Sequence, residues 1–375
     1  MTETLLLILA ALIAIWFVGA RRLRGADLSP FDDAKVGGGE PAHWQRFSSG
    51  PTLNDEHRAV LSTLVGIRSA MNSVPLYRHT AWLRSTMDTM FASHPFDARF
   101  VPVDAGGVPA EWVLAPGASS ARRTLYIHGG AFIAGSPLSH RVITARFSEV
   151  TGGAVLAIDY RLMPEHRRMA GVEDCRKAYR WMLENGPDGA QAPSAVFVAG
   201  DSAGGNLTLS LIAWLRDQGL RSPDAAVAIS PTTDSTLGSP SLKRNLKTDA
   251  MLGPMFAPLT RVPRSALLWV SWIYGRVRPN DPVVSPVFGD LANLPPVLVH
   301  ASEAEMLFDD CRRYVNRARA AGSPATLQTW SHVVHAWQIF NPELPEACSA
   351  LEEIASFLAA AAPPADGAAR SGSHR

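Results

Sequence analysis

The chain has few cysteines and almost no net charge, and each of these features excludes some classes of protein. Its three cysteines, Cys175, Cys311 and Cys348, are far apart and odd in number. They favour neither a disulfide framework nor a metal site, and we expect ordinary buried thiols. The formal net charge of +1 is not the excess of positive charge that is typical of nucleic-acid-binding proteins. His-Glu-x-x-His and Cys-x-x-Cys motifs are absent as well, so no motif indicates a bound metal.

The composition is that of a folded α/β protein with room for insertions. The 375 residues are 47% hydrophobic and 18% charged, which suits one large domain with insertions or two domains. The run Gly37-Gly38-Gly39 lies in a polar stretch with no strand before it. We therefore interpret it as linker rather than as a phosphate-binding loop.

One long uncharged apolar run stands near the N-terminus. Residues 4–20 (TLLLILAALIAIWFVGA) are followed by Arg21, Arg22 and Arg24, whereas Glu3 precedes them. Seventeen residues are at the short end for a spanning helix. Arginines after the run favour an uncleaved single-pass membrane anchor over a cleaved signal peptide or a buried core helix. The sequence thus predicts a transmembrane helix with the body of the protein in the cytoplasm.

After residue 95 the chain alternates short apolar strands with amphipathic helices. Such alternation predicts an α/β fold with a mostly parallel sheet covered by helices on both faces. Residues 172–185 fit one of the helices, which ends at Gly186-Pro187. The predicted strands are two within 99–114 and one each at 124–127, 154–159, 194–199, 225–229, 296–300 and 325–330.

Two segments interrupt this alternation and predict a helical cap. Residues 55–91 have helical apolar spacing, and residues 232–282 are rich in Pro, Met, Leu and Trp and too long for a simple crossover. Several side chains of the second segment either line an apolar pocket or pack the cap: Met251, Met255, Phe256, Leu259, Leu268, Trp269, Trp272 and Ile273. The predicted organisation is anchor 1–24, linker 25–54, cap 55–95, core 96–231, cap insertion 232–282, core 283–362 and disordered tail 363–375.

The most informative motif is GDSAGG at residues 200–205. An apolar, β-prone segment precedes it and a helical pattern follows, as in the strand–turn–helix of a nucleophile elbow. In such a turn Ser202 is forced toward positive φ and its neighbours must be small. The geometry would expose the serine Oγ and aim the N–H of Ala203 at a substrate carbonyl.

Partners for a nucleophilic serine occur at the ends of other predicted strands. Acidic residues follow the strand at 296–300, and His332 and His335 follow the strand at 325–330. The loop HGGAF at residues 128–132 follows the strand at 124–127 and can offer backbone N–H groups to an oxyanion. Acid-then-histidine order after the serine is that of α/β-hydrolases.

These motifs together resemble the hormone-sensitive-lipase family of α/β-hydrolases, of the bacterial esterase type. The resemblance rests on HGGA at 128–131, DYRLMPEH at 159–166, GDSAGGN at 200–206 and DPVVSP at 281–286. It covers roughly residues 70–360. It implies an α/β-hydrolase fold with a cap, hydrolysis of carboxylic esters and no cofactor.

The resemblance also implies a role for each matching residue. Ser202 is the expected nucleophile and His335 the expected base, with His332 as the alternative. Glu305, thirty residues before His335, is the expected acid, with Asp309 as the alternative. The expected oxyanion hole comprises Gly129, Gly130, Ala131 and Ala203, of which the last three donate, with Ala131 able to serve if its φ is negative. His128, Asp201, Arg161 and Glu165 are expected to be structural, the last two in charged pairs.

The sequence therefore predicts a serine hydrolase of short to medium, apolar esters. Lactone, amide or thioester cleavage by the same residues stays open, because the tetrahedral chemistry is shared. A non-catalytic small-molecule receptor and a membrane-tethered scaffold are the alternatives from other classes. The expected partners are a small-molecule ester and a membrane, and a homodimer stays open.

Overall fold

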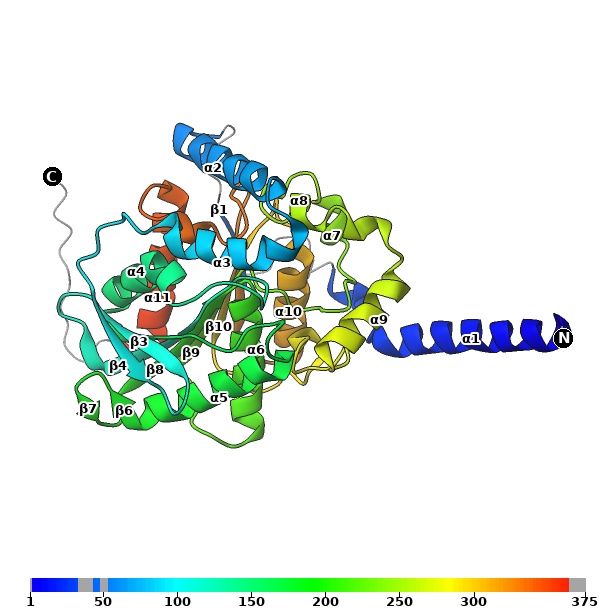
Figure 1. Ribbon diagram of the computed structural model, residues 1–375. Helices are drawn as coiled ribbons and strands as arrows, with labels where there is room; N and C mark the ends of the chain where they lie inside the picture. Colours follow the sequence, from blue (N-terminus) through cyan, green and yellow to red (C-terminus); the bar gives the residue numbers. More distant parts are fainter. Residues whose placement is uncertain (1, 33–42, 48–52, 364–375) are drawn as a thin grey trace.

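The computed structural model describes residues 2–32, 43–47 and 53–363, and its centre is a nine-stranded sheet (Figure 1). The strand order is β1-β11-β10-β9-β8-β4-β5-β3-β2. Neighbours from β1 to β5 are parallel, whereas β3 and β2 are antiparallel at one edge. The strands are β1 Trp44–Phe47, β2 Arg99–Asp104, β3 Pro109–Leu114, β4 Ser119–Ile127, β5 Gly153–Ile158, β8 Ala195–Asp201, β9 Ala225–Ile229, β10 Val297–Ser302 and β11 Ala325–Trp330. A separate two-stranded ladder joins β6 Asn185–Gly186 to β7 Gly189–Ala190.

Helices cover both faces of the sheet, as the alternating sequence pattern predicts. One face is covered by α5 (Arg168–Glu184), α6 (Ala203–Asp217) and α10 (Phe308–Ala320), and the other by α4 (Arg141–Thr151) and α11 (Pro345–Ala361). The 3-10 turns are η1 Ser29–Phe31, η2 Leu76–Arg78, η3 Leu138–His140, η4 Leu259–Arg261, η5 Pro286–Phe288 and η6 Trp337–Phe340.

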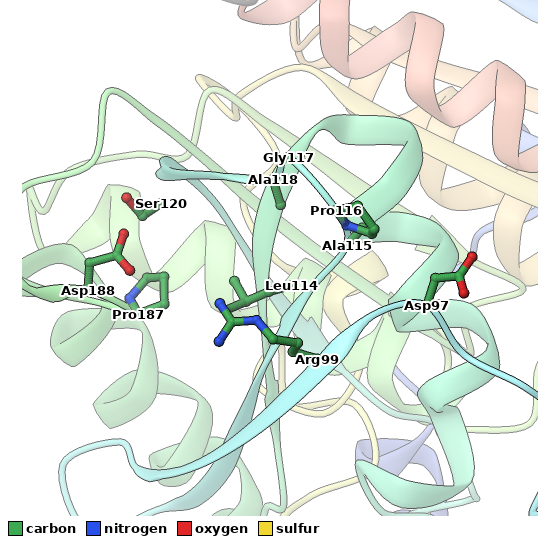
Figure 2. Close-up of a pocket in the computed structure, with 10 residues that line it drawn as sticks. All are labelled: Asp97, Arg99, Leu114, Ala115, Pro116, Gly117, Ala118, Ser120, Pro187 and Asp188. Atoms are coloured by element: carbon green, nitrogen blue, oxygen red, sulfur yellow. The ribbon is translucent and has the colours of Figure 1, made fainter.

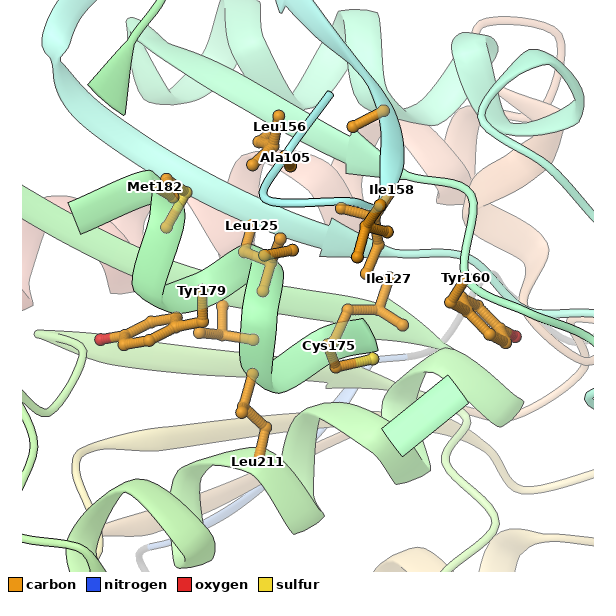
Figure 3. Close-up of a cluster of buried hydrophobic side chains, with 14 of the residues drawn as sticks. Ala105, Leu125, Ile127, Leu156, Ile158, Tyr160, Cys175, Tyr179, Met182 and Leu211 are labelled. Atoms are coloured by element: carbon orange, nitrogen blue, oxygen red, sulfur yellow. The ribbon is translucent and has the colours of Figure 1, made fainter. Parts of the chain in front are cut away.

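The alternation of side chains along β4 shows how both faces are filled. Leu125 and Ile127 pack among the α5 and α6 side chains, including Tyr179 and Leu211 (Figure 3). Tyr126, between them, points to the opposite face and joins the core under α4 and α11. Each fully buried Leu or Ile contributes about 1.5–3 kcal/mol, so this central strand fixes the position of the loop that follows it.

Two groups of helices distant in sequence lie in the segments that the sequence analysis assigns to a cap. The first comprises α2 (Asp55–Asn72) and α3 (His79–Met90), and the second α7 (Ser241–Arg244), α8 (Gly253–Phe256) and α9 (Arg264–Gly275). The first segment is not one continuous helix, because α2 ends before Pro75. Proline lacks an N–H and disfavours helical geometry in the residue before it.

The N-terminal helix α1 (Thr2–Leu23) projects from the body beside α9 (Figure 1). Its end packs on α9, where the rings of Trp16 and Trp269 stack at 5.8 Å. Across the part of the chain that the structure describes, no helix is long and apolar enough to cross a membrane. The predicted transmembrane helix is therefore not supported.

The structure also bears on the predicted linker, the cysteines and the predicted tail. Residues 44–47 lie within the predicted linker but form β1, which pairs with β11 and extends the sheet. Cys175 and Cys311 are buried as expected, whereas Cys348 is half-buried. The glycine run 37–39 and residues 364–375 of the predicted tail lie outside the described residues.

Candidate active site

Ser202 stands at a sharp turn between β8 and α6. Its φ of 50° and ψ of −113° are outside the usual regions for a residue with a side chain, and its N–H donates to the Ile229 carbonyl at 2.7 Å. Such a conformation costs of order 1–3 kcal/mol and persists only where its surroundings fix it. A Cβ at Gly204 would collide with the carbonyl of Ile127. The packing of the elbow therefore requires a glycine two residues after the serine.

His335 and Glu305 form a buried pair beside this turn. His335 Nδ1 lies 2.7 Å from Glu305 Oε2, and Glu305 Oε1 accepts from the Ser302 N–H at 3.1 Å. The other ring nitrogen, Nε2, has no hydrogen-bond partner among the described residues, and no hydrogen bond joins it to Ser202. Ser202 and His335 line the same cavity. In unliganded enzymes, catalytic hydrogen bonds are often long and tighten when substrate binds.

The protonation of this pair follows from burial and mutual charge. Burial raises the pKa of Glu305 and outweighs the opposing influence of His335. For His335, burial alone would lower the pKa, but the hydrogen bond and charge of Glu305 outweigh it and the pKa is raised above its ordinary 6.5. The pair therefore favours a proton on the imidazole once the ring has accepted one.

The two alternatives from the sequence lie elsewhere. Asp309 is buried in an ion-pair cluster with Arg244 and Arg312, at 3.1 and 2.9 Å. His332 is exposed and is not among the residues that line the cavity. Of the two candidate acids and two candidate histidines, Glu305 and His335 are therefore the pair that the structure joins by a hydrogen bond.

The loop after β4 supplies backbone donors, with one exception to the expected set. The N–H of Gly129 donates to Asp201 Oδ1 at 3.1 Å, so it is already engaged and is not free for an oxyanion. The N–H groups of Gly130, Ala131 and Ala203 have no acceptor among the described residues. Gly130 and Ala131 line the cavity with Ser202.

Two residues of this loop have positive φ without being glycine. Ala131 has φ 54° and Phe132 has φ 64°. We expected Ala131 to need a negative φ, and the structure contradicts this. The turn holds it there because Ile133 and Ala134 both donate to the Gly130 carbonyl, at 3.1 and 2.9 Å.

Asp201 has the supporting role expected of it, through a partner that the sequence did not indicate. Its carboxylate accepts from the Tyr126 hydroxyl at 2.9 Å and lies 3.4 Å from His140 Nε2. Burial alone would raise the pKa of Asp201, but His140 and Tyr126 outweigh burial and the pKa is lowered. Asp201 therefore stays ionised and ties the loop of Gly129 to the elbow. No local sequence motif indicates this role of His140, because only the fold brings it to Asp201.

His128 is buried and structural, as the sequence predicts. Its ring stacks on Tyr160 at 4.3 Å and its Nδ1 bonds the Gly129 carbonyl at 2.7 Å. Burial lowers the pKa of His128 to about 3. The ring is therefore neutral at pH 7 and braces the loop.

An arginine of the cap joins this loop to the 159–166 segment. Arg84 on α3 donates to the Ile133 carbonyl at 2.7 Å and the Met163 carbonyl at 3.0 Å, and it pairs with Glu165 at 2.8 Å. The predicted charged pair of Glu165 is confirmed, as is that of Arg161, with Asp174 at 2.7 Å. Sequence reasoning missed Arg84 because its partners lie far along the chain.

The cavity above Ser202 is apolar and about 430 Å³ in volume. Both cap segments line it. From the first segment come Leu64, Ile67, Met71, Leu83, Met87 and Met90. From the second come Met251 and Met255, whereas Leu268 is buried in the cap and Trp272 and Ile273 are exposed.

Another hollow, shown in Figure 2, lies far from this chemistry. It is lined by polar and small residues, including Arg99, Ser120 and Asp188. Ser120 is near the amino end of β4, whereas Ser202 follows the carboxyl end of β8. Ligands in open α/β sheets bind outside the carboxyl ends of the strands. In the described part of the chain, no cluster of three or more His, Cys, Asp or Glu side chains could hold a metal ion.

Comparison with known proteins agrees with this geometry. A family profile described as alpha/beta hydrolase fold matches residues 124–339. An acetyl-hydrolase of Streptomyces hygroscopicus is 38% identical over 256 residues, which are 68% of this chain and 81% of that protein. An esterase of Acinetobacter venetianus is 32% identical over 277 residues, covering 73% of this chain and 87% of the esterase.

Solved structures give the same result. The crystal structure of an esterase from the bacterial hormone-sensitive lipase family is 35% identical, with a TM-score of 0.70 over 82% of this chain and 98% of that one. The fold and the site define an α/β-hydrolase. This chain belongs to the hormone-sensitive-lipase family of α/β-hydrolases.

Proposed function

We propose that this protein is a serine carboxylesterase in which Ser202, His335 and Glu305 form the catalytic triad. The observation that carries the proposal is the buried hydrogen bond of 2.7 Å between Glu305 and His335, beside a serine at positive φ on the same cavity. A histidine held in this way by a carboxylate can activate a serine hydroxyl.

The proposed reaction has two steps. His335 Nε2 takes the proton from Ser202 Oγ as Oγ forms a bond to the ester carbonyl carbon. The protonated imidazole then gives this proton to the leaving alkoxide as the ester C–O bond breaks, which leaves an acyl-enzyme. Water attacks the acyl carbon, His335 takes its proton, and Ser202 departs with that proton restored. Glu305 stabilises the imidazolium in both steps.

The developing oxyanion would be bound by backbone donors. We assign the N–H groups of Gly130, Ala131 and Ala203, because the described residues offer these groups no other acceptor. Gly129 is left out because its N–H is held by Asp201. Donors fixed before the reaction need no reorganisation as charge develops, and removal of one typically costs on the order of 100–1,000-fold in rate.

The cavity favours esters with short to medium, apolar acyl chains. Its volume of about 430 Å³ lies within the usual range for small-molecule sites, and its cap lining is mostly aliphatic and methionine-rich, with Phe91, Asn72 and the single charged residue Arg68. Methionines adapt their shape to irregular apolar ligands.

We also propose that the enzyme works at a membrane, with its catalytic body on the cytoplasmic side. The apolar residues 4–20 are followed by Arg21, Arg22 and Arg24, and anionic lipids of the cytoplasmic leaflet attract such basic groups. Fractionation of cells and protease access from the cytoplasmic side test this placement. Recovery of the chain in a fraction free of membranes would contradict it.

The esterase proposal is tested with p-nitrophenyl esters from C2 to C16. Wild type should hydrolyse the shorter members, and Ser202→Ala should abolish turnover with its melting temperature unchanged. Asp309→Asn serves as the matched control for Glu305→Gln, since both change a buried acid on neighbouring turns. Equal activity losses in these two variants would argue against Glu305 as the triad acid. A folded wild type with no hydrolysis would contradict the proposal.

A further inference from the structure

The proposed function leaves an exposed apolar surface on α9 without a role. Val270, Ile273 and Tyr274 are 61%, 58% and 55% exposed, and their spacing of i, i+3 and i+4 places them on one side of the helix. Trp272 is 38% exposed on its flank. These four side chains are called the α9 face below. A helix in a soluble protein normally turns such a stripe toward the core.

The end of α1 extends this surface. Trp16, Gly19, Ala20 and Leu23 have the spacing of one helix side; Trp16 and Gly19 contact Trp269 of α9, and Ala20 and Leu23 are buried. The Trp269 indole also donates to the Trp16 carbonyl at 3.3 Å. Ile15, Phe17 and Val18, on the other sides of this part of α1, are exposed. Two packed helices therefore present apolar and aromatic side chains to the outside together.

The charged side chains of residues 251–280, which include α9, are all arginines, four in total, and the next residue is Asp281. Arg261, Arg276 and Arg278 are exposed, as are Arg21 and Arg22 on α1. Among the described residues none of these five is within ion-pair distance of a carboxylate. An apolar, Trp- and Tyr-bearing helix face with arginines at its border is complementary to an anionic lipid surface.

The same surface reaches the entrance of the catalytic cavity. Met255 and Pro258 line the cavity and are themselves exposed, and Leu259 and Val262, which follow them, are 41% and 39% exposed. Exposed apolar residues therefore occur at intervals along the chain between the cavity and α9, with Thr260 and Arg261 among them. An apolar ester dissolved in a bilayer could enter the cavity along these residues.

We propose that the α9 face, with the end of α1, docks the protein on the surface of an anionic bilayer. The face lies in the interface with its arginines at the lipid headgroups, and the cavity entrance is at the bilayer surface. A second copy of the chain fits less well, because a two-fold contact would bring the arginines of both copies together. Docking itself does not depend on the proposed esterase activity; only delivery of ester from the bilayer rests on it.

Vesicle binding of the full chain tests the docking. Partition is measured by flotation with vesicles of phosphatidylcholine alone and of phosphatidylcholine with one quarter phosphatidylglycerol. Ile273→Glu should weaken binding to both by at least tenfold, because it removes an aliphatic group that docking would bury in the bilayer and adds a charge there. The matched control is Val101→Glu, which changes an exposed residue of edge strand β2 and should leave binding unchanged.

The arginines are tested separately with Arg261→Gln and Arg276→Gln. Each should weaken binding about fivefold on the anionic vesicles and leave binding to phosphatidylcholine unchanged. Rising salt should reduce the difference between the two vesicle types. Equal binding to both types by wild type would contradict the role of the arginines.

Two outcomes would overturn the docking proposal. One is equal vesicle binding by Ile273→Glu and Val101→Glu. The other is a wild-type dimer that Ile273→Glu dissociates while vesicle binding is unchanged, since the α9 face would then be a subunit interface. Hydrolysis of soluble p-nitrophenyl acetate by each variant reports on the esterase proposal alone, so a failure of one proposal is distinguishable from a failure of the other.

Discussion

At the scale of single residues, the site depends on a few groups whose environment changes their chemistry. His335 is buried, which alone would make its imidazolium unfavourable, yet Glu305 at 2.7 Å more than compensates. Ser202 is held at a positive φ in a turn where a Cβ at Gly200 or Gly204 would collide with the Ile127 carbonyl. In both cases the residue type is common and the constraint around it is specific.

The raised pKa of His335 predicts the pH dependence of activity. A general base must be neutral, so kcat/KM should rise with pH through the pKa of His335, with its acidic inflection above the ordinary 6.5. In Glu305→Gln the compensating charge is lost, and the inflection should move to lower pH while the rate falls by about 10³–10⁴-fold. An unshifted inflection in this variant would contradict the assigned role of Glu305.

Ala131 gives a second prediction at this scale. Its φ of 54° is unfavourable for alanine by about 1–2 kcal/mol, whereas a glycine would add about 0.4–1 kcal/mol of unfolded-state entropy. Ala131→Gly should therefore stabilise the protein slightly, by up to about 1 kcal/mol, and keep its activity because the backbone N–H remains. Denaturant unfolding and ester hydrolysis check the two parts, and a large loss of activity would show that the methyl group positions the loop.

At the scale of elements, cap and catalytic loops are connected through one side chain. Arg84 of α3 bonds the carbonyls of Ile133 and Met163 and pairs with Glu165. The helix that lines the cavity with Leu83 and Met87 thus also holds the loop to which we assign oxyanion donors.

Removal of this connection should impair catalysis more than binding. We expect Arg84→Ala to lower kcat by about 10–100-fold with a smaller change in KM, because misplaced oxyanion donors act on the transition state. Glu165→Gln should cost less, since Arg84 keeps its two carbonyl acceptors. Arg58→Ala, which removes an exposed ion pair with Asp55 on α2, is the control and should be neutral. A purely KM effect for Arg84→Ala would argue against loop positioning.

At the scale of the whole molecule, the cavity is built from two cap segments that are separated in sequence by residues 91–240. Met87 and Met251 reach it from these two segments. We expect Met87→Trp to lower kcat/KM for p-nitrophenyl octanoate at least tenfold and to spare the acetate, because the larger ring shortens the acyl site. A parallel series with Leu76→Trp, on an exposed residue of η2, controls for the added indole. Equal losses on both esters would place Met87 outside the acyl site.

Local sequence patterns predicted much of this fold and site. The sheet strands after residue 95, the elbow at Ser202 and the positions of Glu305 and His335 all follow from patterns of a few residues, and the structure brings the last two together. β1 could not be predicted, because a four-residue edge strand in a polar stretch forms only through pairing with β11. The roles of His140 and Arg84 could not be predicted for a similar reason, because their partners are distant in sequence.

For the N-terminal helix, the sequence predicted a feature that the structure does not support. Its apolar composition predicted a membrane span, yet no described helix has the length and apolarity to cross a bilayer. The sequence could not show that Trp16 and Gly19 meet Trp269, because that contact is made with α9, far along the chain.

The most direct test of the central claim is to trap the acyl-enzyme. Full-length protein is mixed with p-nitrophenyl butyrate, quenched in acid within the burst and analysed by peptide mass spectrometry. We predict one butyryl group on Ser202, and none when Ser202 is alanine or when His335 is alanine. A butyryl group on another residue, or turnover by Ser202→Ala, would contradict the assignment of Ser202 as nucleophile.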